Sequence, residues 1–257
     1  MVKGQQQADS HQCRFCSNLT TFPCRHCLKQ IITDAASVYK QVAADKELIA
    51  SIPRLDKDPR IDLSLVIGTA LLKLSGLRAG TVDGSRPPLQ DVDSGLLLQS
   101  VLVLDTQLKQ TPSDNGLRLL LVQLYLLLGN ASYAHQLWTP LDVKRTIQDA
   151  LSPLFFDRIS TISPALFQGQ GRGLLDPLTH YYNYTIGGDS PLKIWEAYSY
   201  GSYTSILDMV KYDDKLRRSC TLFMTLVEEY RAARLSGTKL EYEIADHPLT
   251  CECSFGL

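Results

Sequence analysis

The stretch that decides the fold spans residues 117–137 and reads LRLLLVQLYLLLGNASYAHQL. Ten of its first twelve residues are apolar, and only Arg118 and Gln123 interrupt the run. Twelve residues are too few to cross a membrane, which takes about 20, so a helix that is apolar on nearly all sides must be covered by protein. Gly129 can supply the left-handed conformation that ends a helix, and a second helical pattern follows it. We therefore expect a helical hairpin in the inner layer of a helical stack.

Helical periodicity recurs on both sides of this hairpin. Apolar residues return at helical spacing over residues 30–52, 60–74, 96–108, 141–159, 195–210 and 216–235. No stretch alternates with a period of two over more than a few residues, so the sequence predicts an all-α fold of about nine helices paired into hairpins. Two segments, 125–134 and 195–203, pass from an aromatic residue through a glycine to a tyrosine, which is similar to the turn of tetratricopeptide repeats. The expected architecture is stacked helical hairpins, a fragment of a TPR-like α-solenoid.

The same patterns divide the chain into five expected parts. Residues 1–28 form a disordered or Cys-rich N-terminal segment, residues 29–159 a helical-repeat region, residues 160–190 an irregular Gly/Pro-rich connection, residues 191–236 the C-terminal helices and residues 237–257 a tail. Within the repeat region, Pro153 should kink or split the last helix, because its ring clashes with the preceding turn. Asp93 or Ser94 is expected to cap the helix that runs to Gln110.

Composition argues against DNA and membranes as partners, and the N-terminal sequence favours a cytoplasmic protein. Apolar residues make up 44% of the chain and charged residues 21%, which is ordinary for a globular protein. With 26 basic and 27 acidic residues the net charge is −1, so overall charge indicates neither DNA binding nor membrane binding. The N-terminal residues lack the basic-then-apolar form of a signal peptide, and a cytoplasmic location is therefore the expectation.

Four cysteines near the N-terminus form two Cys-x-x-Cys pairs, Cys13 with Cys16 and Cys24 with Cys27. In a cytosolic protein such pairs favour a metal over disulfides, and four thiolates can bind zinc tetrahedrally. The seven-residue spacer between the pairs is shorter than the usual ~15–20 residues. Two interpretations stay open: zinc bound by these four cysteines, or a tail without any cofactor that leads into a helix beginning near Cys24.

Residues 168–173 contain Gln-x-x-Gly-x-Gly, the pattern of the pyrophosphate loop in acetyl-coenzyme A enzymes of the GNAT type. Backbone amides in such a loop bind phosphates at a helix N-terminus. The pattern should follow a strand and open a helix, but here it follows Ser163-Pro164 and Pro177 lies four residues beyond it. A Gly-rich loop is the favoured interpretation, and an acetyltransferase using this loop is the alternative. Neither a Gly-x-Ser-x-Gly elbow nor a Walker phosphate loop occurs, so no catalytic residues are predicted.

Several segments together resemble a known family. They are residues 115–129, 141–144, 147–149, 195–203 and 226–229. They resemble the large auxiliary subunit of the NatB N-terminal acetyltransferase complex, with the fungal form the most similar, over roughly residues 55–235. The resemblance is to the C-terminal portion of that subunit.

The resemblance implies a non-catalytic, all-helical, TPR-like scaffold that wraps a separate catalytic GNAT subunit. Together the two subunits acetylate nascent chains beginning Met-Asp, Met-Glu, Met-Asn or Met-Gln at the ribosome, and actin and tropomyosin substrates link the family to the cytoskeleton. Acetyl-coenzyme A binds the catalytic partner, so the resemblance assigns no catalytic or cofactor-binding residue to this chain. The alternative function is a zinc-stabilised helical adaptor with unrelated protein partners.

Overall fold

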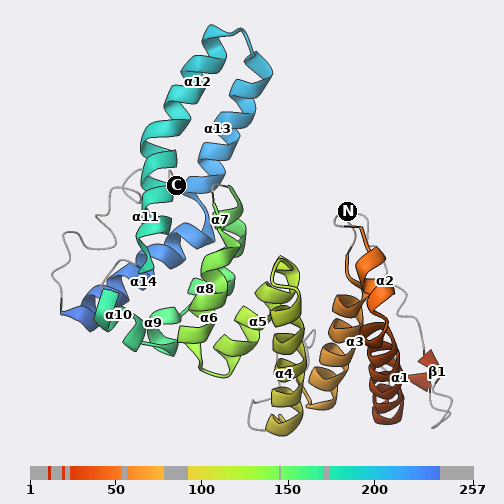
Figure 1. The fold of residues 1–257 in the computed structure, drawn as a ribbon. Helices are drawn as coiled ribbons and strands as arrows, with labels where there is room; N and C mark the ends of the chain where they lie inside the picture. The colour runs from red at the N-terminus through yellow and green to blue at the C-terminus, as the bar shows by residue number, and fades with distance from the viewer. Residues whose placement is uncertain are drawn as a thin grey trace. The chain divides into compact units, whose positions relative to one another are not determined.

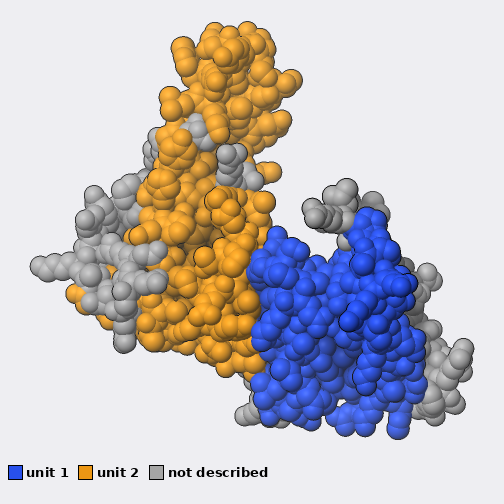
Figure 2. Space-filling view, viewed as in Figure 1, with its two compact units in different colours: residues 1–121 blue, residues 122–257 orange. Residues whose placement is uncertain are grey.

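The computed structural model describes residues 11–12, 19–20, 24–53, 57–77, 92–144, 146–170 and 174–237. Apart from one short antiparallel pair, β1 (His11–Gln12) with β2 (Leu19–Thr20), the regular elements in this part of the chain are helices. The all-α prediction is confirmed. The chain forms two compact units, residues 1–121 and residues 122–257 (Figure 2).

Unit 1 contains α1 (Arg25–Ala44), α2 (Lys46–Ser51), α3 (Pro59–Leu74) and α4 (Ser94–Gln110). Helix α3 packs on both α1 and α4 (Figure 1). Three aspartates start these helices, because the side chains of Asp45, Asp58 and Asp93 accept hydrogen bonds from backbone N–H groups of the first turn. The predicted helix from Ser94 to Gln110, with Asp93 as its cap, is therefore confirmed.

Helices α3 and α4 approach each other closely at Gly68. A Cβ atom at this position would lie 2.8 Å from Cδ2 of the fully buried Leu104. The Ser100 hydroxyl donates a hydrogen bond of 2.8 Å across the same contact to the Gly68 carbonyl. Glycine is needed here because the leucine side chain occupies the space of its Cβ.

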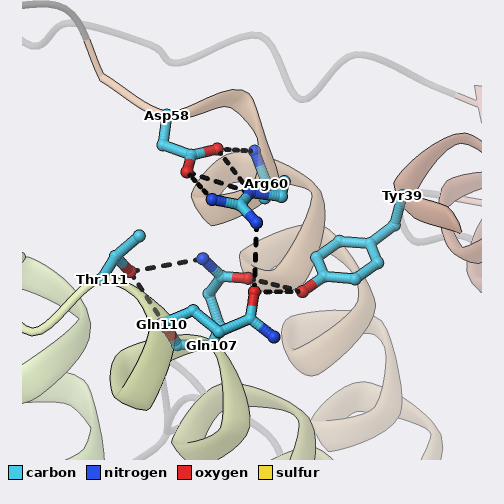
Figure 3. A network of polar contacts seen from close by, with 6 residues as sticks. All are labelled: Tyr39, Asp58, Arg60, Gln107, Gln110 and Thr111. Carbon is cyan, nitrogen blue, oxygen red and sulfur yellow. Dashed lines mark hydrogen bonds and ion pairs between the residues drawn. The ribbon is translucent and has the colours of Figure 1, made fainter. Parts of the chain in front are cut away.

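A polar network joins α1, the start of α3 and the end of α4 (Figure 3). The Tyr39 hydroxyl donates to Gln107 Oε1 at 2.7 Å, and Arg60 Nη1 donates to Gln110 Oε1 at 3.3 Å. Arg60 also pairs with Asp58 at 2.6 Å, and this hydrogen-bonded guanidinium lowers the pKa of the Asp58 carboxyl. Because these side chains satisfy one another, the network holds the helix ends together and offers little to a ligand.

The predicted central hairpin is present. Helix α5 (Asn115–Leu127) begins in unit 1 and ends in unit 2, and Leu117, Leu121 and Val122 are fully buried. Gly129 has a φ of +75°, as its place at the helix end predicted. The Asn130 side chain then caps α6 (Ala131–Trp138).

The remainder of unit 2 is also helical, with short helices up to α10 and longer ones after it. They are the 3-10 turn η2 (Thr139–Leu141), α7 (Thr146–Leu151), α8 (Pro153–Phe156), α9 (Ile159–Ile162), α10 (Ala165–Gln170), α11 (Asp176–Tyr184), the π-helical turn η4 (Thr185–Asp189), α12 (Ser190–Ser199), α13 (Tyr203–Arg217) and α14 (Cys220–Ser236). Pro153 opens α8, so the predicted split is confirmed. The prediction of one helical stretch beginning at Leu141 is wrong, because η2 ends there and Asp142 has a left-handed backbone conformation.

Two further segments differ from the sequence prediction. Residues 160–190 were expected to be irregular, whereas the described residues there are mostly helical, in α9, α10, α11 and η4. In α11 the proline is tolerated because Pro177 lies in the first turn, where a missing N–H costs nothing. The last helix begins at Cys220, not Leu216, because Ser219 caps it while α13 continues to Arg217.

An aromatic cluster fills the part of unit 2 beside α6 and α8. The Phe155 ring stacks on Trp138 with centroids 5.4 Å apart and meets Phe156 edge-on at 4.9 Å. The His135 ring lies 5.8 Å from Phe155, and burial lowers the pKa of this imidazole. The cluster therefore favours the neutral form of His135.

We expect acid to destabilise unit 2 through His135. The pKa of its imidazole is lower in the folded chain than the ordinary value of about 6.5 that applies when unfolded. Its contribution to the free energy of unfolding is present above pH ~6.5 and is lost as the pH falls through the folded-state pKa. Urea unfolding at pH 7.5 and at pH 5.5 checks this: His135→Gln should show a smaller loss of stability between the two pH values than the wild type. Equal losses in both proteins would contradict it.

Candidate partner interface

Helices α12 and α13 pack on each other as a hairpin, which we call the arm (residues 190–217). The two helices run side by side (Figure 1), and η4 connects α11 to α12. Gly201, with a φ of +71°, forms the turn between them. Ala197 is the buried apolar residue of α12, so the arm has a thin core of its own.

The outside of the arm carries large apolar side chains. The exposed ones, which we call the arm surface, are Leu192, Trp195, Tyr198, Tyr200, Tyr203, Leu207 and Val210. Trp195 is 69% exposed and stacks on Tyr198 at 5.8 Å, and Tyr198 meets Tyr203 across the turn at 6.2 Å. Leu207 and Val210 follow Tyr203 by four and seven residues, which places the three on one stripe of α13. A continuous exposed apolar surface of this kind marks an interaction site.

The base of the arm is fixed to the core of unit 2. The Tyr181 and Tyr212 hydroxyls lie 2.7 Å apart and join α11 to α13. Arg217 pairs with Asp213 at 2.7 Å and donates to the Ile186 carbonyl at 3.5 Å. Beneath these contacts one buried cluster contains Tyr181, Tyr182, Ile186, Leu216, Leu222 and Leu226. The arm is therefore held in place before any partner binds.

Asp149 joins α7 to α11 and to the N-terminus of α14. Its carboxylate accepts hydrogen bonds from the Tyr182 hydroxyl, at 2.7 Å, and from the Ser219 hydroxyl, and its carbonyl accepts from Thr221 Oγ1 at 2.7 Å. Burial, together with the hydrogen bond to Asp149, raises the pKa of the Tyr182 hydroxyl. A carboxylate at a helix N-terminus is favoured by the helix dipole, so we interpret Asp149 as a structural residue.

Glu228 is a second carboxylate that is used inside the fold. It is almost fully buried on α14, and its Oε2 accepts a hydrogen bond of 2.8 Å from the Ser160 backbone N–H at the start of α9. Its other oxygen pairs with Arg231 at 2.9 Å. A buried charge needs such partners, and these contacts show how Glu228 is satisfied without a substrate.

The structure describes two of the four cysteines of the predicted zinc site, Cys24 and Cys27. Cys24 caps α1, and its Sγ accepts a hydrogen bond of 3.5 Å from the Cys27 backbone N–H. Cys13 and Cys16 lie outside the described residues, so a zinc site formed by the four cysteines stays a prediction. In the part of the chain that the structure describes, no three His, Cys, Asp or Glu side chains gather where they could hold a metal ion.

The coenzyme-type pattern lies in an unsuitable context. Residues 168–170 end helix α10, whereas a pyrophosphate loop of this type should follow a strand. Residues 171–173 lie outside the described part of the chain. The structure therefore gives no support to the interpretation of this chain as an acetyltransferase.

Sequence reasoning missed the arm surface. It predicted helices on both sides of Gly201 but treated their aromatic residues as part of a repeat turn. The available signal was the crowding of Trp195, Tyr198, Tyr200 and Tyr203 within nine residues, more aromatic area than one two-helix hairpin can bury.

These observations define the class of the protein as an all-helical protein with stacked hairpins and an exposed aromatic arm. Within the described residues, every helix is too short or too polar to cross a bilayer. The chain matches, over residues 1–250, the family model described as the N-acetyltransferase B complex (NatB) non catalytic subunit, and it belongs to that family. As the resemblance implied, the family is that of the non-catalytic subunit.

One relative in this family is the N-terminal acetyltransferase B complex subunit MDM20 of Saccharomyces cerevisiae, which is 27% identical over 158 residues. The matched region covers 60% of this chain and 19% of the yeast protein, so the chain spans about a fifth of that relative's length. No solved structure matches the chain.

Proposed function

We propose that this chain is a scaffold segment that binds the catalytic GNAT-type subunit of a NatB-type complex. The observation that carries the proposal is the family match over residues 1–250. In this function the chain makes no bond and breaks none. It holds the catalytic subunit, which binds acetyl-coenzyme A and transfers the acetyl group to the N-terminus of a nascent chain.

The finer features of the function follow from the family resemblance. We propose that the substrates begin Met-Asp, Met-Glu, Met-Asn or Met-Gln, and that the complex works in the cytoplasm beside the ribosome. We also propose that the stacked hairpins are TPR-like repeats, since each unit of such a stack buries its apolar face against its neighbours. The half-buried Asp149 and the buried Glu228 support a structural function, because both carboxylates are hydrogen-bonded within their own chain.

The proposal is tested by co-expressing the whole chain with the catalytic acetyltransferase subunit of the same organism. We expect the two to elute together in size-exclusion chromatography and to acetylate Met-Asp and Met-Glu peptides faster than the catalytic subunit alone. Calorimetric titration of the chain alone with acetyl-coenzyme A should show no binding. Separate elution, or acetyl-coenzyme A binding to the chain alone, would contradict the proposal.

A further inference from the structure

We propose that the arm surface is the binding site for the catalytic subunit. This inference rests on the proposed function and assigns it to one surface: Leu192, Trp195, Tyr198 and Tyr200 from α12 and the turn, and Tyr203, Leu207 and Val210 from α13. Three observations carry it: the area of the surface, its charge and its rigid base.

The area is what one side of a stable protein–protein interface needs. Four aromatic side chains exposed by more than half offer roughly 100–150 Å² each, given about 150–250 Å² for a whole side chain. The three aliphatic residues expose 50–69% of their surface and add on the order of 30–80 Å² each. The sum, roughly 500–800 Å², approaches the ~800 Å² that each partner contributes to a standard interface. A surface of this size is costly to leave in water and is sufficient for one stable partner.

The charges of the arm favour a protein over RNA or an anionic membrane. Residues 190–217 contain four basic and four acidic residues, so the arm is neutral overall. Charges of α13 are paired along the helix, Arg217 with Asp213 at 2.7 Å and Lys211 with Asp208 at 3.9 Å. Phosphate-rich partners need an excess of Lys and Arg. Exposed Trp and Tyr, with an apolar body and a polar tip, are the residues enriched at protein interfaces.

The base of the arm reduces the cost of binding. The hydroxyl contact between Tyr181 and Tyr212 and the bond from Arg217 to the Ile186 carbonyl fix α13 to α11. A surface that is already ordered loses little conformational entropy when a partner covers it. Since the chain is the non-catalytic subunit of a two-component activity, the catalytic subunit is the partner that this ordered surface fits.

The test uses the full chain and measures its affinity for the purified catalytic subunit by calorimetry. Trp195→Ala on α12 and Leu207→Ser on α13 should each weaken binding, Trp195→Ala by about 30-fold or more, the effect of losing an interface hot spot. The matched control is Leu102→Ser on α4, because Leu102 is 66% exposed and Leu207 63%. It should change the affinity by less than about twofold. Circular dichroism melts of all three variants should match the wild type, since these side chains lie in water.

The outcomes separate the two proposals. If the wild type binds the catalytic subunit and the affinities of both arm variants are within about twofold of the wild type, the arm surface is not the binding site. The scaffold function then still stands. If the wild type fails to bind, both proposals fail. If the chain alone forms a dimer in light scattering and Trp195→Ala makes it monomeric, the arm surface binds a second copy of this chain. That result would overturn the assignment to the catalytic subunit. The wild type should not bind vesicles of anionic lipid. If it does bind them and Trp195→Ala abolishes that binding, the assignment to the catalytic subunit is likewise overturned.

Discussion

Phe155→Ala should lower the free energy of unfolding of unit 2 by about 3–5 kcal/mol, the range for removing a fully buried phenyl ring. Phe155 has no exposed surface and lies in ring contact with Trp138, Phe156 and His135. The alanine variant loses the transfer energy of the ring and leaves a cavity between rigid neighbours that cannot close on it. Domains are typically stable by only about 5–15 kcal/mol, so this loss is a large share.

The measurement is urea unfolding followed by tryptophan fluorescence, because Trp138 lies against Phe155 and reports on the cluster. The matched control is Phe223→Ala on α14, where the phenyl ring is 41% exposed. That change should cost clearly less than Phe155→Ala, because two fifths of the Phe223 side chain already lies in water. If both variants lose the same stability, the cluster around Phe155 is not a tightly packed core.

Sequence reasoning succeeded where one residue decides the backbone by itself. Gly129 permits a positive φ, Asp93 offers an oxygen to the first N–H groups of a helix, and Pro153 lacks the N–H that a helix interior needs. These effects act within one turn of the chain, so they are visible without knowing the rest of the fold. The hairpin at residues 117–137 follows from them and from the length of its apolar run.

Sequence reasoning could not predict contacts between residues that are far apart in the chain. The glycine at position 68 is required by Leu104, which lies on another helix. Asp149 is satisfied by Tyr182 and Ser219, at separations of 33 and 70 residues. No periodicity identifies such partners, because the side chains meet only after the helices have packed.

The arm surface could not be predicted from the sequence for a different reason. Helical spacing of apolar residues predicts that a helix buries one face, but it does not say what covers that face. In α12 and α13 the apolar stripe faces solvent. Leu207 and the buried Leu216 look alike in the sequence, and only the structure shows that one lies on the arm surface and the other in the core. A subunit of a complex is expected to contain such stripes, since part of its hydrophobic surface is buried by another chain.

Leu124→Ala is the second change with a large expected effect, a loss of roughly 2–5 kcal/mol in the free energy of unfolding. Leu124 is 4% exposed in the middle of the apolar run, so its truncation leaves a cavity in α5. For a chain of this length such a loss lowers the melting temperature by on the order of 10 °C. Leu102→Ala on α4, at 66% exposure, is the matched control and should stay within about 0.5 kcal/mol of the wild type.

The comparison of these two leucines decides whether α5 is an inner layer. Both lie inside a leucine-rich helix, so helix propensity changes by a similar amount in the two variants. What remains is the difference in burial, about one leucine side chain removed from water and its cavity. A melting shift near zero for Leu124→Ala would mean that the longest apolar run of the chain is not covered by the fold. In that case its cover would have to come from outside the described residues.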